Sequence, residues 1–305
     1  MIGIEALEGV WTVVPTPFAD AGSLDVPSLR TLTDWVVERG VNGMTILGVM
    51  GEASKISDAE RTAVIETVIG QANGRIPVCV GVSHAATDRA VAFAREAVAF
   101  GAHSVMLAPP ALARPNEAAL RRHYFAVAES IDRPIVVQDH PASSGVWMTP
   151  EFLASLASES TKCRVVKLEE EPSPPKVERL LKANPEVRVL GGLGAMMLLE
   201  ELRRGAAGTM TGFGFPEILV DIMARWRRAD VDGATEVFYR YAPLIRFENQ
   251  PLLGLPIRKH IYQRRGAIAS ARVRAPAAAL DPGTITELDD LLTRLGLATG
   301  AAAAR

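Results

Sequence analysis

The sequence predicts a closed (β/α)₈ barrel, followed by a helical extension at the C-terminal end of the chain. Short apolar runs recur at roughly thirty-residue spacing, and each is followed by a longer stretch with helical periodicity. Strands that alternate with helices are typical of right-handed βαβ units and a parallel sheet. Eight such units fit within the 305 residues, and barrels of this kind routinely exceed ~250 residues as one domain.

The predicted strands are apolar and rich in β-branched residues. In order, they cover residues 11–15, 44–47, 78–82, 104–108, 134–138, 164–168, 187–190 and 208–211. An open doubly wound sheet is the alternative, but no Gly-x-Gly-x-x-Gly turn follows the first strand to support a dinucleotide site. The nearest match, Gly191-Gly192-Leu193-Gly194, follows the seventh strand, where a barrel would use it as a tight turn beside the site.

Amphipathic helices are predicted between the strands, at residues 28–39, 58–71, 88–100, 117–130 and 150–158. Ser57 and Glu60 have the spacing of a capping box that opens the second of these helices. Pro150, directly after Thr149, fits the first turn of a helix. Glycines stand where helices should end before the next strand, at positions 40, 74, 101 and 205.

Beyond the eighth strand the pattern contains only helices and loops. The predicted helices cover residues 217–228, 234–247, 254–264 and 284–295. We therefore divide the chain into a barrel at residues 1–215 and a helical subdomain at residues 216–297. The remaining residues, 298–305, are rich in alanine and glycine, and we expect them to be frayed.

Composition and charge exclude several functional classes. The net charge of −2 lacks the excess of basic residues that binding to nucleic acid or to an anionic membrane requires. The N-terminal residues lack the pattern of a signal peptide, and no apolar run approaches the ~18 residues of a membrane span. Cys79 and Cys163, the only cysteines, lie in apolar strand-like contexts, which suits small core residues in a reducing compartment. We expect a soluble, cytoplasmic protein that binds a small molecule.

Lys167, within the sixth predicted strand, is the leading candidate for a catalytic residue. It is the only lysine on any predicted strand, and burial of an amine disfavours its charged form and thereby favours a nucleophile. Period-two alternation places Val165, Lys167 and Glu169 on one face of the strand. If the other face packs against helices, Lys167 points into the barrel, as a Schiff base with a keto substrate requires. The alternative is a structural lysine paired with Glu169.

Other candidates follow from the rule that a (β/α)₈ barrel carries its active site at the carboxyl ends of its strands. The turn Gly48-Val49-Met50-Gly51-Glu52 could offer backbone N–H groups to a carboxylate or phosphate, or could be a plain structural turn. Gln138, Asp139 and His140 end the fifth strand. No His, Cys, Asp and Glu residues have the spacing of metal ligands, so we expect no metal site.

A set of motifs in fixed order makes the chain resemble a known family. The motifs are Val14-Pro15-Thr16-Pro17-Phe18 with Gly22, Asp25 and Leu29, then Gly40-Val41-Asn42-Gly43, Gly48-Val49-Met50-Gly51-Glu52, Gly74-Arg75-Ile76-Pro77-Val78, Gly81, Gly101-Ala102, Pro109-Pro110, Pro141, Gly145, Lys167 and Gly205-Ala206-Ala207-Gly208. Through the barrel and much of the tail, the chain resembles the dihydrodipicolinate synthase / N-acetylneuraminate lyase family, the pyruvate-type class I aldolases and lyases.

The resemblance implies a barrel with a C-terminal helical extension, usually assembled as a tetramer or another homo-oligomer. It also implies a lysine, here Lys167, that condenses with the ketone of a 2-oxo acid such as pyruvate. The iminium formed in this way withdraws electrons for C–C bond formation, C–C cleavage or dehydration, so that no cofactor is needed. At the positions of Val49 and Met50 the family binds the keto-acid carboxylate. With them, our candidate substrate-binding residues are Gly51 and Glu52 of the same turn and Gly192 and Thr211 at the ends of the last two strands.

The chain also departs from the family pattern around this lysine. Val49 and Met50 replace two threonines, which removes hydroxyls worth roughly 0.5–1.5 kcal/mol per missing hydrogen bond. Gln138 replaces the acid–base tyrosine, and an amide cannot transfer protons near neutral pH. Ala111-Leu112 stands in place of a second tyrosine, and Ser143 lies where synthases carry an arginine for the second substrate.

These departures argue against dihydrodipicolinate synthase activity and against a plain sialic acid lyase, but not against imine chemistry. The first hypothesis is a Schiff-base lyase, aldolase or dehydratase that acts on a 2-oxo acid, either pyruvate or a 2-keto-3-deoxy sugar acid. Lys167 would be the nucleophile, and Gln138 and Asp139 complete the candidate catalytic set. Asp139, His140, Glu52 or Glu169 would transfer protons. A paralogue that binds keto acids with weakened catalysis is the second hypothesis, and dihydrodipicolinate synthase proper is the third.

Overall fold

The computed structural model describes residues 3–111 and 116–297, so the predicted frayed tail at 298–305 lies outside the described residues. Eight parallel strands form a closed barrel in which each strand pairs with the next and β8 pairs with β1. The strands are β1 (Gly9–Val13), β2 (Gly43–Ile46), β3 (Val78–Gly81), β4 (Ser104–Leu107), β5 (Ile135–Asp139), β6 (Val165–Leu168), β7 (Arg188–Gly191) and β8 (Gly208–Thr211). The predicted (β/α)₈ barrel is confirmed.

Side chains from alternate positions fill the barrel interior, so the barrel is a packed core and not a pore. The interior cluster contains Leu7, Trp11, Val13, Cys79, Met106, Val136, Val165, Leu190 and Met210. On β6, Val166 and Leu168 belong instead to the larger cluster between the strands and the helices. The predicted alternation of β6 is therefore confirmed, and the face of Val165 and Lys167 is the interior face. Cys79 and Cys163 are free and buried.

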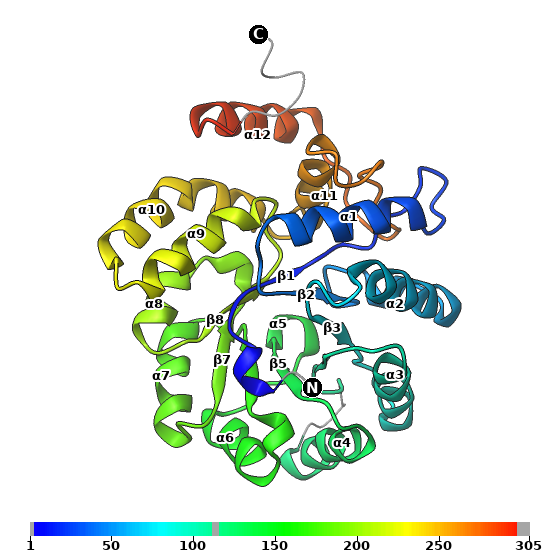
Figure 1. Ribbon diagram of the computed structural model, residues 1–305, viewed down its shortest axis with the longest axis vertical. Coiled ribbons are helices and arrows are strands. Elements are labelled where there is room, and N and C mark those ends of the chain that lie inside the picture. The colour runs from blue at the N-terminus through cyan, green and yellow to red at the C-terminus, as the bar shows by residue number, and fades with distance from the viewer. Residues whose placement is uncertain (1–2, 112–115, 298–305) are drawn as a thin grey trace.

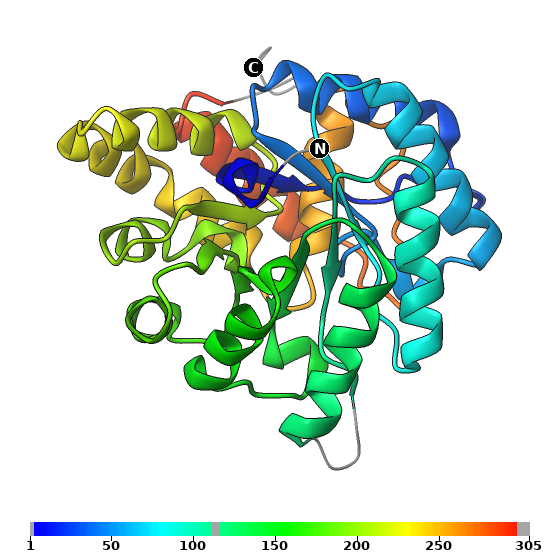
Figure 2. The ribbon, with the colours of Figure 1, turned by 60° about the horizontal axis from the view of Figure 1, so that its bottom comes forward.

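The helices that surround the barrel (Figure 1) are α1 (Val26–Glu38), α2 (Asp58–Ala72), α3 (Thr87–Ala99), α4 (Glu117–Ser130), α5 (Pro141–Ser144), α6 (Pro150–Glu159), α7 (Ser173–Ala183), α8 (Leu198–Arg203) and α9 (Pro216–Arg227). Figure 2 shows the blue and cyan helices of the first third of the chain along one side of the barrel. Ser57 and Glu60 form the predicted capping box of α2, and Thr149 caps α6 with Pro150 in its first turn. These caps determine the residues at which α2 and α6 begin after the loops that precede them.

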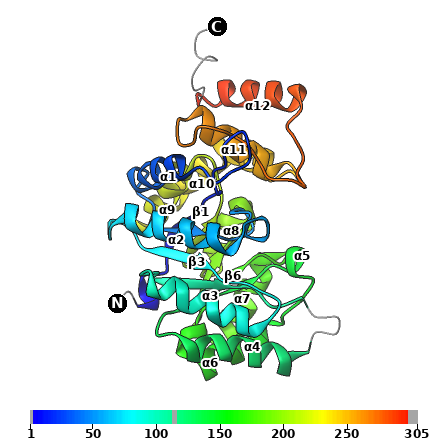
Figure 3. The same cartoon turned by 90° about the vertical axis from the view of Figure 1, so that its right-hand side faces the viewer.

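The C-terminal extension consists of α10 (Val231–Glu248), α11 (Gly254–Arg264) and α12 (Pro282–Arg294). α12 lies at the opposite end of the molecule from α4 and α6 (Figures 1 and 3). The predicted boundary after residue 215 falls before α9, which packs against β1 and α10 in the position of the eighth barrel helix. No helix within residues 3–111 and 116–297 is both long and apolar enough to cross a membrane.

Candidate active site

Lys167 lies on the interior face of β6 and is 5% exposed. Its Nζ is 2.9 Å from Oε2 of Glu169, which is itself buried just beyond the end of the strand. The backbone of Glu169 stays in register, because its N–H donates to the carbonyl of Asp139 on β5 over 2.8 Å. The extended backbone of β6 therefore holds amine and carboxylate on one face, two positions apart.

Gln138 completes this cluster from the neighbouring strand. It stands opposite Lys167 in the β5–β6 register, and its Nε2 donates to the same Oε2 of Glu169 over 2.8 Å. Burial alone would raise the pKa of Glu169, but Lys167, His140 and Gln138 together outweigh it and lower that pKa. Glu169 is thus held as a carboxylate against the amine, a position from which it can accept or return a proton.

Gly192, at the end of β7, makes room for this carboxylate. A Cβ atom at position 192 would lie 2.3 Å from Cγ of Glu169, far inside van der Waals contact. Only glycine therefore lets the backbone of residue 192 lie against Glu169. The predicted substrate-binding residue Gly192 is brought to the site, where it shapes the position of a side chain.

A cavity of about 690 Å³ opens beside the cluster at the carboxyl ends of β2 to β5. Gln138 lines it from the barrel, and Gly48 and Val49 line it from the turn after β2. Its other lining residues include the hydroxyl-bearing Ser83, Ser143 and Ser144, the basic Arg61 and Arg89, and the apolar Met106 and Ala111. Leu112, the other residue at the place of the second tyrosine, lies outside the described residues. A drug-sized, partly polar molecule fits a cavity of this volume.

The turn after β2 is held in one conformation by its own hydrogen bonds. The N–H of Gly51 donates to the carbonyl of Gly48 over 3.0 Å, and the hydroxyl of Thr16 donates to the carbonyl of Gly51 over 2.7 Å. Among the described residues, the backbone N–H groups of Val49 and Met50 have no hydrogen-bond acceptor. Successive free amides in a fixed turn are suited to bind a carboxylate.

Two predicted site residues lie away from the lysine. Asp139 follows Gln138 on β5 and therefore points to the helix side, where its Oδ2 is 2.6 Å from Nζ of Lys176 on α7. Burial, only partly offset by Lys176, raises its pKa to about 6. Thr211 follows the interior residue Met210 on β8, so it too lies on the opposite face. The structure does not bring Asp139 or Thr211 together with Lys167.

Met50 and Glu52 meet residues of the C-terminal extension that the sequence analysis did not single out. The Sδ atom of Met50 lies 2.8 Å from Nη1 of Arg258, and Oε1 of Glu52 lies 2.6 Å from Nζ of Lys259. Arg258 and Lys259 both lie on α11, about two hundred positions further along the chain. No local periodicity or motif relates residues so far apart, so only the folded structure could identify them.

The part of the chain that the structure describes offers no metal site near this cluster. Within residues 3–111 and 116–297, no group of three or more His, Cys, Asp or Glu side chains could hold a metal ion. The chemistry that the described side chains offer is that of an amine, a carboxylate and an amide in close contact, beside a turn that can bind an anion.

Comparisons with known proteins find relatives over nearly the whole chain. The model of the dihydrodipicolinate synthetase family matches residues 6–295. An L-2-keto-3-deoxyarabonate dehydratase of Azospirillum brasilense is 36% identical over 293 residues, which cover 94% of each chain. A 4-hydroxy-tetrahydrodipicolinate synthase of Methanothrix thermoacetophila is 32% identical over 299 residues, or 96% of this chain and 98% of that one.

Solved structures are similar over nearly the whole chain as well. A dihydrodipicolinate synthase from Rhodopseudomonas palustris has a TM-score of 0.89 at 35% identity and covers 95% of this chain and 98% of its own. A prophage protein of E. coli K12, solved in complex with pyruvate, has a TM-score of 0.89 at 26% identity. The match covers 95% of this chain and 99% of that chain. This chain therefore belongs to the dihydrodipicolinate synthetase family, whose members are lyases of the class I aldolase type.

Proposed function

We propose that this protein is a dehydratase that removes water from a 2-keto-3-deoxy sugar acid bound to Lys167 as a Schiff base. The observation that carries the proposal is the buried contact of 2.9 Å between Nζ of Lys167 and Oε2 of Glu169. An amine that condenses with a ketone needs a nearby group to take up and return protons, and Glu169 is that group here.

The reaction begins when Lys167 passes its proton to Glu169 and the neutral amine attacks the C2 ketone. Glu169 returns this proton to the hydroxyl of the carbinolamine, which leaves as water. The resulting iminium draws electrons from the adjacent C3–H bond. Glu169 accepts the C3 proton, and an enamine forms. The enamine electrons then expel the C4 hydroxyl group, which takes the proton from Glu169 and leaves as water. Hydrolysis of the unsaturated iminium releases the product and restores the free amine.

Gln138 has a supporting role in this scheme. An amide is neither a general acid nor a general base near neutral pH, so Gln138 cannot replace the tyrosine that the family resemblance leads one to expect. Its Nε2 donates to the Oε2 atom of Glu169 that also faces Lys167. We assign Gln138 the task of orienting the carboxylate, while Glu169 does the proton transfer.

The cavity supports a substrate longer than pyruvate. The free amides of Val49 and Met50 suit the carboxylate of the keto acid, and the hydroxyls of Ser83, Ser143 and Ser144 suit a hydroxylated tail. Ser143 leaves no cation where a synthase would bind its second carboxylate. The similarity to a 2-keto-3-deoxyarabonate dehydratase agrees with this choice. By family analogy, we also infer a homo-oligomer, a tetramer or a dimer, that acts in the cytoplasm.

The test is a dehydration assay with 2-keto-3-deoxy sugar acids of five and six carbons, with the synthase reaction run in parallel. We expect Lys167→Arg to abolish dehydration. We expect Glu169→Gln to lower kcat by about 10²–10⁴-fold, while Glu170→Gln, a change at the neighbouring carboxylate, leaves it nearly unchanged. Robust synthase activity without any dehydration would overturn the proposal.

A further inference from the structure

The segment that follows α11 runs across the loops after β1 and β2 and is fastened to both. The Ser270 hydroxyl donates to Oδ1 of Asp20 over 2.6 Å, and the Ala269 N–H donates to the Ser28 hydroxyl over 2.9 Å. Further along, Nε and Nη2 of Arg274 donate to the carbonyl of Gly22 over 3.0 and 2.9 Å. We call residues 269–274 the strap.

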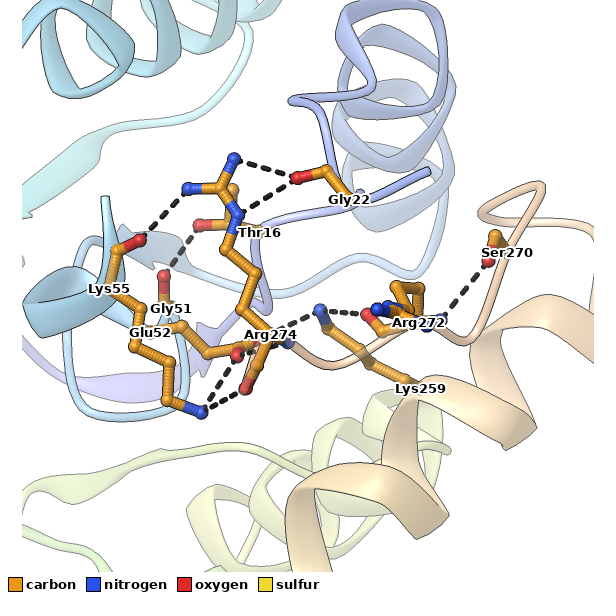
Figure 4. A network of polar contacts seen from close by, with 9 residues as sticks. All are labelled: Thr16, Gly22, Gly51, Glu52, Lys55, Lys259, Ser270, Arg272 and Arg274. Carbon is orange, nitrogen blue, oxygen red and sulfur yellow. Dashed lines mark hydrogen bonds and ion pairs between the residues drawn. The ribbon is translucent and has the colours of Figure 1, made fainter. Parts of the chain in front are cut away.

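The strap and α11 converge on one carboxylate, that of Glu52 (Figure 4). Its Oε1 accepts from Nζ of Lys259 over 2.6 Å. Its Oε2 accepts from the backbone N–H of Arg274 over 3.0 Å and from Nζ of Lys55 over 3.1 Å. The Lys259 ammonium also donates to the carbonyl of Arg272 over 2.7 Å and lies 4.5 Å from the centre of the Phe18 ring.

The Glu52–Lys259 pair is fully buried and sits at a strained point of the backbone. The side chains of Glu52 and Lys259 are 1% and 0% exposed. Glu52 has a φ of +53°, a left-handed conformation that is unfavourable for a residue with a side chain and persists only where its surroundings enforce it. Three donors to one carboxylate supply that enforcement.

Glu52 is also the last residue of the turn that faces the cavity. Its own N–H donates to the carbonyl of Val49 over 3.1 Å. The conformation of Glu52 is therefore coupled to the Val49–Met50 peptide plane, which carries the free N–H of Met50 and adjoins that of Val49. Glu52 does not line the cavity, and neither does Lys259 or any residue of the strap. The contacts of Glu52 therefore act on the cavity only through the turn.

We propose that Glu52 and Lys259 form a positioning pair through which the C-terminal extension fixes the turn after β2 and thereby sets the affinity for the carboxylate of the 2-oxo acid. The inference rests on the proposed function in one respect, the assignment of the turn amides to that carboxylate. It makes α11 and the strap a functional part of the site, although they contribute no atom to the cavity.

The experiment compares two ketones that differ in charge, pyruvate and its uncharged methyl ester, in borohydride trapping on the full-length protein. The variant Glu52→Gln/Lys259→Met removes the pair without leaving a lone buried charge. We expect its half-saturating pyruvate concentration to rise about tenfold, the effect of one lost charge-assisted contact. The half-saturating ester concentration and the maximal trapping rate should stay within about twofold of wild type.

Two further variants complete the design. Glu52→Gln alone leaves Lys259 two acceptors, the new amide oxygen and the carbonyl of Arg272. It should raise the half-saturating pyruvate concentration by a smaller factor, and it serves if the double variant does not fold. The control, Glu217→Gln/Arg265→Met, removes another ion pair that ties the end of α11 to the barrel helix α9, where Nη2 of Arg265 lies 2.5 Å from Oε1 of Glu217. This control variant should leave the half-saturating concentrations of both ketones unchanged.

Equal shifts for pyruvate and its ester, or a shift for neither, would overturn the positioning pair. Failure of the wild type to trap any ketone would instead overturn the Schiff base of the proposed function. The pair is then tested by calorimetric binding of pyruvate to the same variants, where an unchanged affinity in Glu52→Gln/Lys259→Met would overturn it.

Discussion

At the scale of single residues, the site consists of one carboxylate oxygen that an amine and an amide both contact. Oε2 of Glu169 faces both Nζ of Lys167 and Nε2 of Gln138. The sequence left open that Lys167 is only a structural lysine paired with Glu169. The observed ion pair also fits that alternative, because a buried lysine needs a counter-charge. A cavity that reaches Gln138, in a family of lyases, favours chemistry over a purely structural pair.

The backbone at Gly192 provides a test of how closely Glu169 must be placed. We expect Gly192→Ala to lower kcat by about 10²-fold, because the new Cβ lies 2.3 Å from Cγ of Glu169 and must displace the carboxylate. Steady-state kinetics with a circular dichroism control check this. Wild-type kcat in a folded Gly192→Ala protein would show that the position of Glu169 does not matter.

Glu201 on α8 gives a pH-dependent stability that can be measured separately from catalysis. Burial, only partly offset by Ser173, raises its pKa to about 7, from an ordinary value of 4.5. Its contribution to stability is therefore complete below about pH 4.5 and is lost as the pH rises through 7. We expect the free energy of unfolding of Glu201→Gln, relative to that of wild type, to rise by about 2–3 kcal/mol between about pH 5 and pH 8.

Urea unfolding at both pH values measures this difference. Glu200→Gln, a change at the exposed neighbouring carboxylate on α8, is the matched control and should show no such pH dependence. An unfolding free-energy difference between Glu201→Gln and wild type that is the same at both pH values would contradict the raised pKa of Glu201.

At the scale of elements, the barrel helices follow their local signals closely. The capping box at Ser57 and the N-cap at Thr149 place α2 and α6 where the sequence predicts them, because these contacts lie within a few residues of one another. The strap could not be predicted in the same way. Lys259 and Glu52 meet only because the extension folds back over the loops after β1 and β2.

α2 also offers a substitution that should strengthen the fold. Gly70 lies inside this helix, and a Cβ atom there meets nothing within 4 Å. We expect Gly70→Ala to raise the free energy of unfolding by about 0.5–1 kcal/mol, since glycine loses more backbone entropy than alanine in a helix. Urea unfolding checks this, and a destabilised Gly70→Ala would mean that position 70 is more confined than the structure shows.

At the scale of the whole molecule, the sequence predicts the fold well and the site in part. Eight apolar runs and the helical patterns between them suffice for the barrel, and alternation on β6 places Lys167 inside it. The same alternation could have set Asp139 and Thr211 apart, because each follows an interior residue on its strand. The sequence does not show which carboxylate lies against Lys167. That depends on the register of β5 and β6, which places Gln138 opposite Lys167.

Borohydride trapping with pyruvate and a panel of 2-keto-3-deoxy sugar acids, followed by peptide mapping, tests directly whether Lys167 forms a Schiff base. We expect an adduct of substrate mass on Lys167, strongest for a sugar acid, and none in Lys167→Arg. A wild-type protein that forms no adduct, or that forms it on another lysine, would rule out Schiff-base chemistry at Lys167 and leave Lys167 and Glu169 as a structural ion pair.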